Sequence, residues 1–162
     1  MANFVVEEKE AFRFVGYKVQ LGPSARIHAE GYSPVKTEFF KGTLQNGKMA
    51  ALKPISESPY GYAVVTADQT GAYYYAGVVS SHPAAEGTEE VQFPKGLYLV
   101  VSGKGGLSRL AFDKLEDQAF NEILTGDAQY RYTGGPVAEV LLNGNPMDAE
   151  VEIWVPVESK KC

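Results

Sequence analysis

Two segments near the C-terminus decide the fold: residues 136–142 (PVAEVLL) and residues 150–157 (EVEIWVPV). The second segment alternates apolar residues with polar and aromatic ones: Val151, Ile153, Val155 and Val157 on one face, and Glu150, Glu152 and Trp154 on the other. An alternation with a period of two predicts a half-buried strand, so its second face forms a separate surface. The two segments therefore predict an antiparallel hairpin.

A single carboxylate, Glu139, interrupts the apolar pattern of the first segment. Burying an unpaired carboxylate costs several kcal/mol or forces its protonation, so the sequence predicts a partner for Glu139. The pattern leaves open whether that partner is a neighbouring side chain such as Arg131, a backbone amide, or a cationic ligand.

Two further kinds of element precede this hairpin. Strands are expected at 11–21, where Gly22 and Pro23 stop the pattern, at 60–65 and 73–79 on either side of a turn, and at 95–102. Apolar residues spaced by threes and fours from Leu107 to Leu124 predict a helix with Gly126 as its C-cap. A weaker helical pattern runs over 35–52, where Gly42 and Gly47 each cost about 1 kcal/mol in a helix interior.

The elements repeat in order along the chain, as strand, helix and hairpin followed by strand, helix and hairpin. We expect one domain over 1–162, built from two pseudo-symmetric β-α-β-β units at about 4–82 and 91–157, with a linker at 82–90. The predicted class is α+β, with antiparallel sheets, two helices on one side and a central ligand cleft on the other.

Composition limits the partners. The chain has 162 residues, 44% hydrophobic content, a net charge of −5, and a single cysteine, Cys162, at its end. The acidic balance and the scattered basic residues argue against nucleic acid binding. We find neither a membrane-spanning run nor a signal peptide, and one cysteine forms no internal disulfide, so a cytoplasmic location without membrane contact is expected.

Six short segments, in order along nearly the whole chain, resemble the GyrI-like small-molecule-binding family. They are 10–17 (EAFRFVGY), 59–62 (PYGY), 73–79 (YYYAGVV), 93–98 (FPKGLY), 134–139 (GGPVAE) and 150–156 (EVEIWVP). This family includes effector-binding domains of AraC- and MerR-type multidrug regulators and the gyrase-inhibitor proteins. One departure is the segment 36–52, which lacks the tryptophan often seen there.

The resemblance implies a central groove lined by aromatic residues and one acidic residue, which corresponds here to Glu139. Such grooves take hydrophobic, cationic, aromatic compounds, for drug or effector sensing or sequestration. The aromatic residues expected to stack on the ligand are Trp154, Tyr75, Tyr62 and Tyr98. Glu152 shares the face of Trp154 and is either a second acid of the site or part of a solvated rim. The chain leaves no room for a helix-turn-helix, so a regulatory role would need a protein partner.

Two other functions stay open. The first, which the resemblance to standalone members of the family implies, is a hydrolase of electrophilic, cyclopropane-bearing compounds with Glu139 as the catalytic group. Two carboxylates near one cleft would also suit general acid–base chemistry. The second is a gyrase-inhibitor-like interaction module that acts through the acidic stretch 86–90.

The remaining motifs are weak. His28 and His82 show no metal-ligand spacing, and the stretch 80–82 (SSH) reads as a loop instead of a catalytic triad. The stretch 103–106 (GKGG) resembles a phosphate cradle but lacks the Walker pattern, so an ordinary turn is the better interpretation. No metal and no cofactor are expected.

Overall fold

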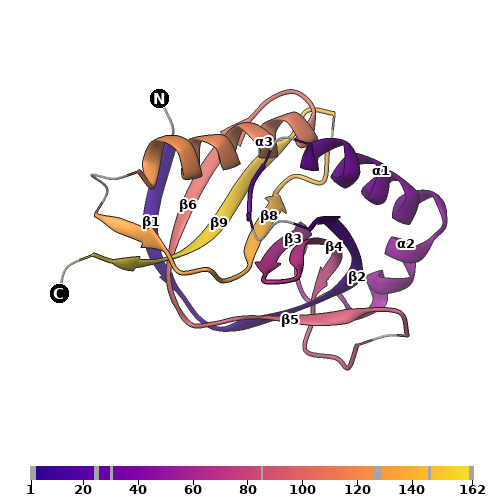
Figure 1. Ribbon diagram of the computed structural model, residues 1–162. Helices are drawn as coiled ribbons and strands as arrows, with labels where there is room; N and C mark the ends of the chain where they lie inside the picture. Colours follow the sequence, from indigo (N-terminus) through magenta and orange to yellow (C-terminus); the bar gives the residue numbers. More distant parts are fainter. Residues whose placement is uncertain are drawn as a thin grey trace.

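The computed structural model is a curled antiparallel sheet with helices packed on one of its faces (Figure 1). The structure describes residues 3–23, 26–29, 31–84, 86–125, 129–145 and 147–160, so the predicted C-cap Gly126 and the terminal Cys162 lie outside the described part. The strands are β1 (Asn3–Lys9), β2 (Phe12–Gly22), β3 (Gly61–Asp68), β4 (Gly71–Val79), β5 (Glu89–Phe93), β6 (Gly96–Lys104), β7 (Tyr130–Tyr132), β8 (Val137–Leu141) and β9 (Glu150–Ser159). The helices are α1 (Tyr32–Gln45), α2 (Lys48–Leu52) and α3 (Ser108–Gln118), with a 3-10 turn at Lys53–Ile55 and a π-helical turn at Ala119–Ile123.

The strand order has an internal two-fold symmetry. It runs β1-β6-β9-β8-β3-β4-β2-β5, with β7 also paired to β9. Reversing this order exchanges β6-α3-β8-β9 with β2-α1-β3-β4, so the predicted class of two β-α-β-β repeats is confirmed. The centre of the symmetry lies between β3 and β8, where Ala63 is paired with Glu139.

Each repeat lends one short strand to the other. The strand that precedes the first repeat, β1, pairs with β6 of the second, whereas β5 pairs with β2 of the first. Neither strand was predicted. β1 is mostly exposed and lacks a clean apolar alternation, and β5 begins at Glu89, inside the stretch expected to be a linker.

The weaker of the two helical patterns is divided at Gly47, whereas Gly42 lies inside α1. α1 ends at Gln45, Gly47 adopts a φ of 80°, and α2 begins at Lys48. That positive φ is accessible to glycine and strained for other residues, so Gly47 separates the two helices instead of continuing one.

The second helical pattern is confirmed in position and in most of its face. α3 and the π-helical turn together cover 108–123. Leu115 and Ala119 of the expected stripe are buried, and its later apolar residues pack against the same core. The exceptions are Leu107 and Leu110, which are 46% and 64% exposed, whereas Phe112 and Glu116 are buried although the stripe did not include them. None of the described helices is long and apolar enough to cross a membrane.

The sheet buries side chains on both faces. The helix face packs against α1 and α3; its core includes Tyr74, Val101, Phe112, Leu115, Val137, Ile153 and Val155. The aromatic face is the opposite one; its core includes Phe14, Tyr62, Tyr75, Phe93, Tyr98, Val140 and Trp154. In Figure 1, α1 and α3 lie end to end along one side of the sheet, over the symmetry centre.

Candidate functional site

The expectation that Glu139 and Trp154 share one cleft is wrong. Directly opposed residues of an antiparallel pair point to the same face, and Glu139 is opposite Ile153 whereas Trp154 is opposite Ala138. Glu139 therefore lies on the helix face, beneath the junction of α1 and α3, and Trp154 lies on the aromatic face.

The partner predicted for Glu139 is a set of hydrogen-bond donors from other side chains of the protein. Its Oε1 accepts hydrogen bonds from Tyr74 Oη at 2.9 Å and from Arg109 Nη1 at 3.0 Å. Its Oε2 accepts from Lys36 Nζ at 3.1 Å and from Arg109 Nη2 at 3.0 Å. The carboxylate is fully buried, so these four bonds replace its hydration.

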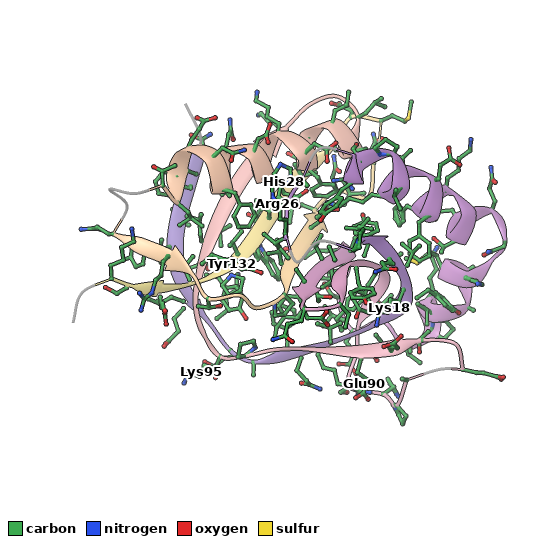
Figure 2. The ribbon with its side chains drawn as sticks, viewed as in Figure 1. Lys18, Arg26, His28, Glu90, Lys95 and Tyr132 are labelled. Carbon is green, nitrogen blue, oxygen red and sulfur yellow. The ribbon has the colours of Figure 1, made fainter. Side chains whose placement is uncertain are left out.

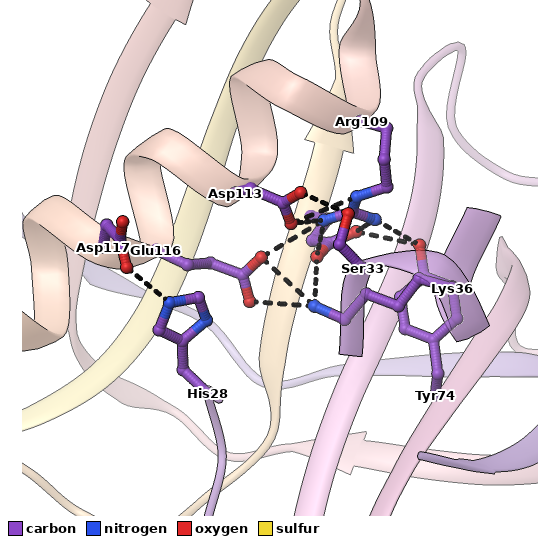
Figure 3. A network of polar contacts seen from close by, with 9 residues as sticks. His28, Ser33, Lys36, Tyr74, Arg109, Asp113, Glu116 and Asp117 are labelled. Atoms are coloured by element: carbon purple, nitrogen blue, oxygen red, sulfur yellow. Dashed lines mark hydrogen bonds and ion pairs between the residues drawn. The ribbon is translucent and has the colours of Figure 1, made fainter. Parts of the chain in front are cut away.

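A second buried carboxylate, Glu116 of α3, shares these cations. Lys36 Nζ lies 3.2 and 3.3 Å from its two oxygens, and Arg109 Nη2 lies 3.3 Å from one of them. Figure 3 shows the Lys36 side chain extending from α1 toward the carboxylate of Glu116. The result is a cluster of two acids and two bases, within which Lys36 joins the first repeat to the second across 80 and 103 sequence positions.

The two buried acids titrate in opposite directions. Burial raises the pKa of Glu116 to about 8; the charge of Lys36 lowers this pKa, and the charge of Glu139 raises it. Burial would also raise the pKa of Glu139, but the charges of Arg109 and then Lys36 hold it well below its ordinary value. At neutral pH the cluster therefore holds an ionised Glu139 and a Glu116 that readily keeps its proton.

Arg109 connects this cluster to solvent. Its side chain is 17% exposed, whereas those of Lys36, Glu116 and Glu139 are at most 1% exposed. Its guanidinium carbon lies 5.9 Å from the ring centre of Tyr74 and 5.6 Å from that of Phe112. Asp113 accepts from Arg109 at 2.8 Å and from Ser33 of α1 at 2.5 Å, which closes the junction of the two helices.

Four of the other predicted site residues gather on the aromatic face. The ring of Trp154 meets that of Tyr62 at 5.9 Å, and its indole nitrogen donates to Glu152 at 2.9 Å. Tyr75 packs edge-on against Phe14 at 6.4 Å. The side chains of Trp154, Tyr62 and Tyr75 are each less than a tenth exposed, so these rings pack into a closed cluster.

Tyr98 belongs to the same face but is fully buried. Its hydroxyl donates to the carbonyl of Pro94 at 2.7 Å, and burial raises its pKa to about 12. These contacts give Tyr98 a packing role within the β5–β6 connection.

Lysines of the chain already stand over these rings. Lys9 Nζ lies 4.1 Å from the ring centre of Trp154, and Lys18 Nζ lies 4.4 Å from that of Tyr73 and 5.8 Å from that of Tyr75. At these distances a cation is attracted by the ring face. The aromatic face is therefore able to hold cations.

The weak histidine candidates stay apart. His28 Nε2 lies 2.7 Å from Asp117, and His82 Nε2 lies 3.9 Å from Glu57. Ser81 donates to Glu57, not to His82. Across the described residues, no three His, Cys, Asp or Glu side chains gather in a way that could hold a metal ion.

The sequence did not lead us to four residues of this cluster, because the core was sought among apolar stripes. They are Lys36, Tyr74, Arg109 and Glu116. A signal was present, because Lys36 lies four residues after the buried Tyr32 and Glu116 lies four residues after the buried Phe112. Charged residues in register with a buried helix face indicate a buried ion pair.

Comparisons with known proteins identify the class. The fold is that of GyrI-like effector-binding domains: SAV2435 bound to tetraphenylphosphonium superposes with a TM-score of 0.75 at 15% identity, covering 96% of this chain and 94% of that one. The integron cassette protein VCH_CASS2 of Vibrio cholerae gives a TM-score of 0.63 at 15% identity, covering 96% and 95%. The C-terminal domain of EcmrR gives 0.62 at 14% identity, covering 98% and 99%.

The family follows from the sequence itself. The model of the family described as integron-associated effector binding protein matches residues 6–157, and this chain belongs to that family. The resemblance drawn from the six segments is thus confirmed, and the chain is a domain of the effector-binding class. Among curated protein sequences, none matches significantly.

Proposed function

We propose that this domain binds lipophilic aromatic cations between α1 and α3, with Glu139 as the countercharge, for effector sensing or sequestration. One observation carries the proposal: Arg109 presents a planar cation that is bonded to Glu139, flanked by the rings of Tyr74 and Phe112, and 17% exposed. A cationic aromatic ligand is also planar, positively charged and able to stack on these rings. Arg109 therefore occupies, in the ligand-free protein, the position that the ligand would take.

Charge balance then gives the selectivity. A cation that displaces Arg109 keeps Glu139 neutralised, whereas a neutral molecule of the same shape leaves the buried carboxylate with only Lys36 and Tyr74. Removing one partner of a buried ion pair costs about 3–5 kcal/mol, which a neutral ligand has no means to offset. The tetraphenylphosphonium bound to SAV2435 supports a ligand of this chemistry at the level of a shared fold.

The aromatic face offers a second location for the same ligand. The residues lining it would then be Trp154, Tyr62, Tyr75 and Glu152, and the buried Tyr98 belongs to the same cluster. The position of Lys9, 4.1 Å from the Trp154 ring, favours this location. We place the site at Glu139 because a buried charge discriminates more strongly than an aromatic ring.

The contacts give less support to the two rival functions. A general base must take up a proton, and Glu139 has a lowered pKa and four donors around it, which disfavours the hydrolase. In the acidic stretch 86–90, Glu89 is paired with Lys18 and Glu90 with Arg13, so two of its carboxylates face basic residues of β2 and not a partner. Figure 2 labels Glu90 at β5 and Lys18 above this strand.

The test compares two ions of the same shape and opposite charge. Titration calorimetry should show that tetraphenylphosphonium binds and that tetraphenylborate does not. Glu139→Gln should weaken tetraphenylphosphonium by about 1–3 kcal/mol, with Glu152→Gln as the matched control. If Glu152→Gln weakens binding and Glu139→Gln does not, the ligand binds on the aromatic face. If the two ions bind equally, the charge-based mechanism is refuted.

A further inference from the structure

A cavity on the other flank of α3 stands apart from the cluster around Glu139. It has a volume of about 350 Å³ and lies between the end of β6 with the turn that follows it and one side of α3, as far as Gln118. This volume falls in the range of small-molecule sites, which is about 300–1,000 Å³. We propose that this cavity is a second ligand site, which takes an amphipathic anion such as a medium-chain carboxylate.

The side of the cavity formed by α3 is mostly apolar. Its apolar lining residues are Leu107, Leu110, Ala111 and Leu115, beside Lys114 and Gln118. Leu107, which directly precedes α3, and Leu110 are 46% and 64% exposed. Covering large apolar side chains is favourable, so an alkyl chain laid along this wall would be stabilised.

The opposite side of the cavity is built from the turn at Gly103, Gly105 and Gly106. Gly105 and Gly106 have φ values of 97° and 73°, which other residues rarely adopt. A Cβ atom added at either would meet nothing within 4 Å. The turn therefore leaves open space above its backbone, and the stretch that resembled a phosphate cradle forms part of a cavity.

The charge of the cavity is opposite to that of the protein. The chain carries 20 acidic and 15 basic residues. Of the described residues that line the cavity, Lys104 and Lys114 are charged and none is acidic. Glu150 is paired with Lys104 in the β6–β9 register, but it is exposed and outside the lining. An anionic head group beside an apolar wall fits this arrangement.

The two sites use different sides of the same helix. Arg109, Asp113 and Glu116 point toward α1 and the centre of the sheet, as Figure 3 shows, and they bond to Lys36, Ser33 and Glu139. Leu107, Leu110 and Lys114 line the cavity instead. An anion bound there would not contact Glu139, so the two ligands should bind without competition.

The test uses decanoate and decyltrimethylammonium, which share an alkyl chain and differ in head-group charge. Calorimetry on the full chain saturated with tetraphenylphosphonium, which occupies the proposed site at Glu139, should show that decanoate binds and that the ammonium compound does not. Lys104→Glu and Lys114→Glu should each weaken decanoate about tenfold, since attraction is replaced by repulsion, and salt should weaken it further. Leu110→Ser should weaken it through the lost apolar contact, and its exposed position leaves folding intact.

Two controls separate this site from the one at Glu139. Lys41→Glu makes the same charge change at an exposed position of α1 and should leave decanoate binding unchanged. Glu139→Gln should also leave it unchanged, and saturating tetraphenylphosphonium should not displace it. Equal binding of both head groups, indifference to both lysine reversals, or displacement by tetraphenylphosphonium would each overturn the proposal.

Discussion

The substitution Glu139→Gln should lower the free energy of unfolding by about 3 kcal/mol at pH 7. The wild-type carboxylate accepts four hydrogen bonds at 2.9–3.1 Å, three of them from Lys36 and Arg109. The amide keeps one acceptor oxygen but brings an NH₂ group toward these cations. Breaking a buried pair costs about 3–5 kcal/mol, and we expect the lower end because both cations keep Glu116 as a partner.

Urea denaturation followed by circular dichroism measures this loss, and the m-value should not change. The deficit should also depend on pH. The charges of Arg109 and Lys36 hold the pKa of Glu139 well below its ordinary value of 4.5, so its contribution is fully present above pH 4.5. It is lost as the pH falls through the folded-state pKa, and the variant should then approach the wild type. A loss below about 1 kcal/mol, as for an exposed carboxylate, or a deficit that is independent of pH, would refute the buried-charge reasoning.

Four other outcomes follow from the same contacts. Burial raises the pKa of Glu116 to about 8, so wild-type stability should fall as the pH rises from 4.5 toward 8, and thermal melts of Glu116→Gln should lack this fall. Arg109→Met should bind tetraphenylphosphonium more tightly in calorimetry, because the internal cation that competes for the carboxylate is gone. Lys9→Met should change the emission of Trp154, the single tryptophan, because Lys9 Nζ lies 4.1 Å from its ring. Gly77→Ala should unfold at much lower urea, because its Cβ would lie 2.0 Å from a backbone oxygen of β2.

The architecture was predictable because strand alternation and helix periodicity are local. The hairpin at 61–79, the strands β2 and β6, and the closing pair β8 and β9 all lie where the pattern places them. The two strands that were missed have a weak or short apolar pattern. β1 is mostly exposed and is held by its hydrogen bonds to β6. β5 buries Val91 and Phe93, but it has only five residues and begins inside the acidic stretch expected to be a linker.

The helix faces were harder to predict. A leucine in register with a stripe is expected to be buried, but Leu110 is 64% exposed on the side of α3 that lines the cavity. The polar residues Lys36 and Glu116 take buried positions because each satisfies the other. The helical register places each charge on a buried face, but the identity of its partner depends on a residue far away in the chain, which no local period reports.

By itself the sequence determined the alternation within each strand, the two-fold order of the elements, and the need of Glu139 for a partner. Only the tertiary structure decided the face on which Glu139 lies, because that depends on the pairing of β8 with β9 and on which side the helices pack. The same packing brings Lys36 of the first repeat and Arg109 of the second repeat into contact with Glu139. Alternation determines which residues of one strand share a face. Which of the two faces the helices then cover is decided only when the sheet is assembled.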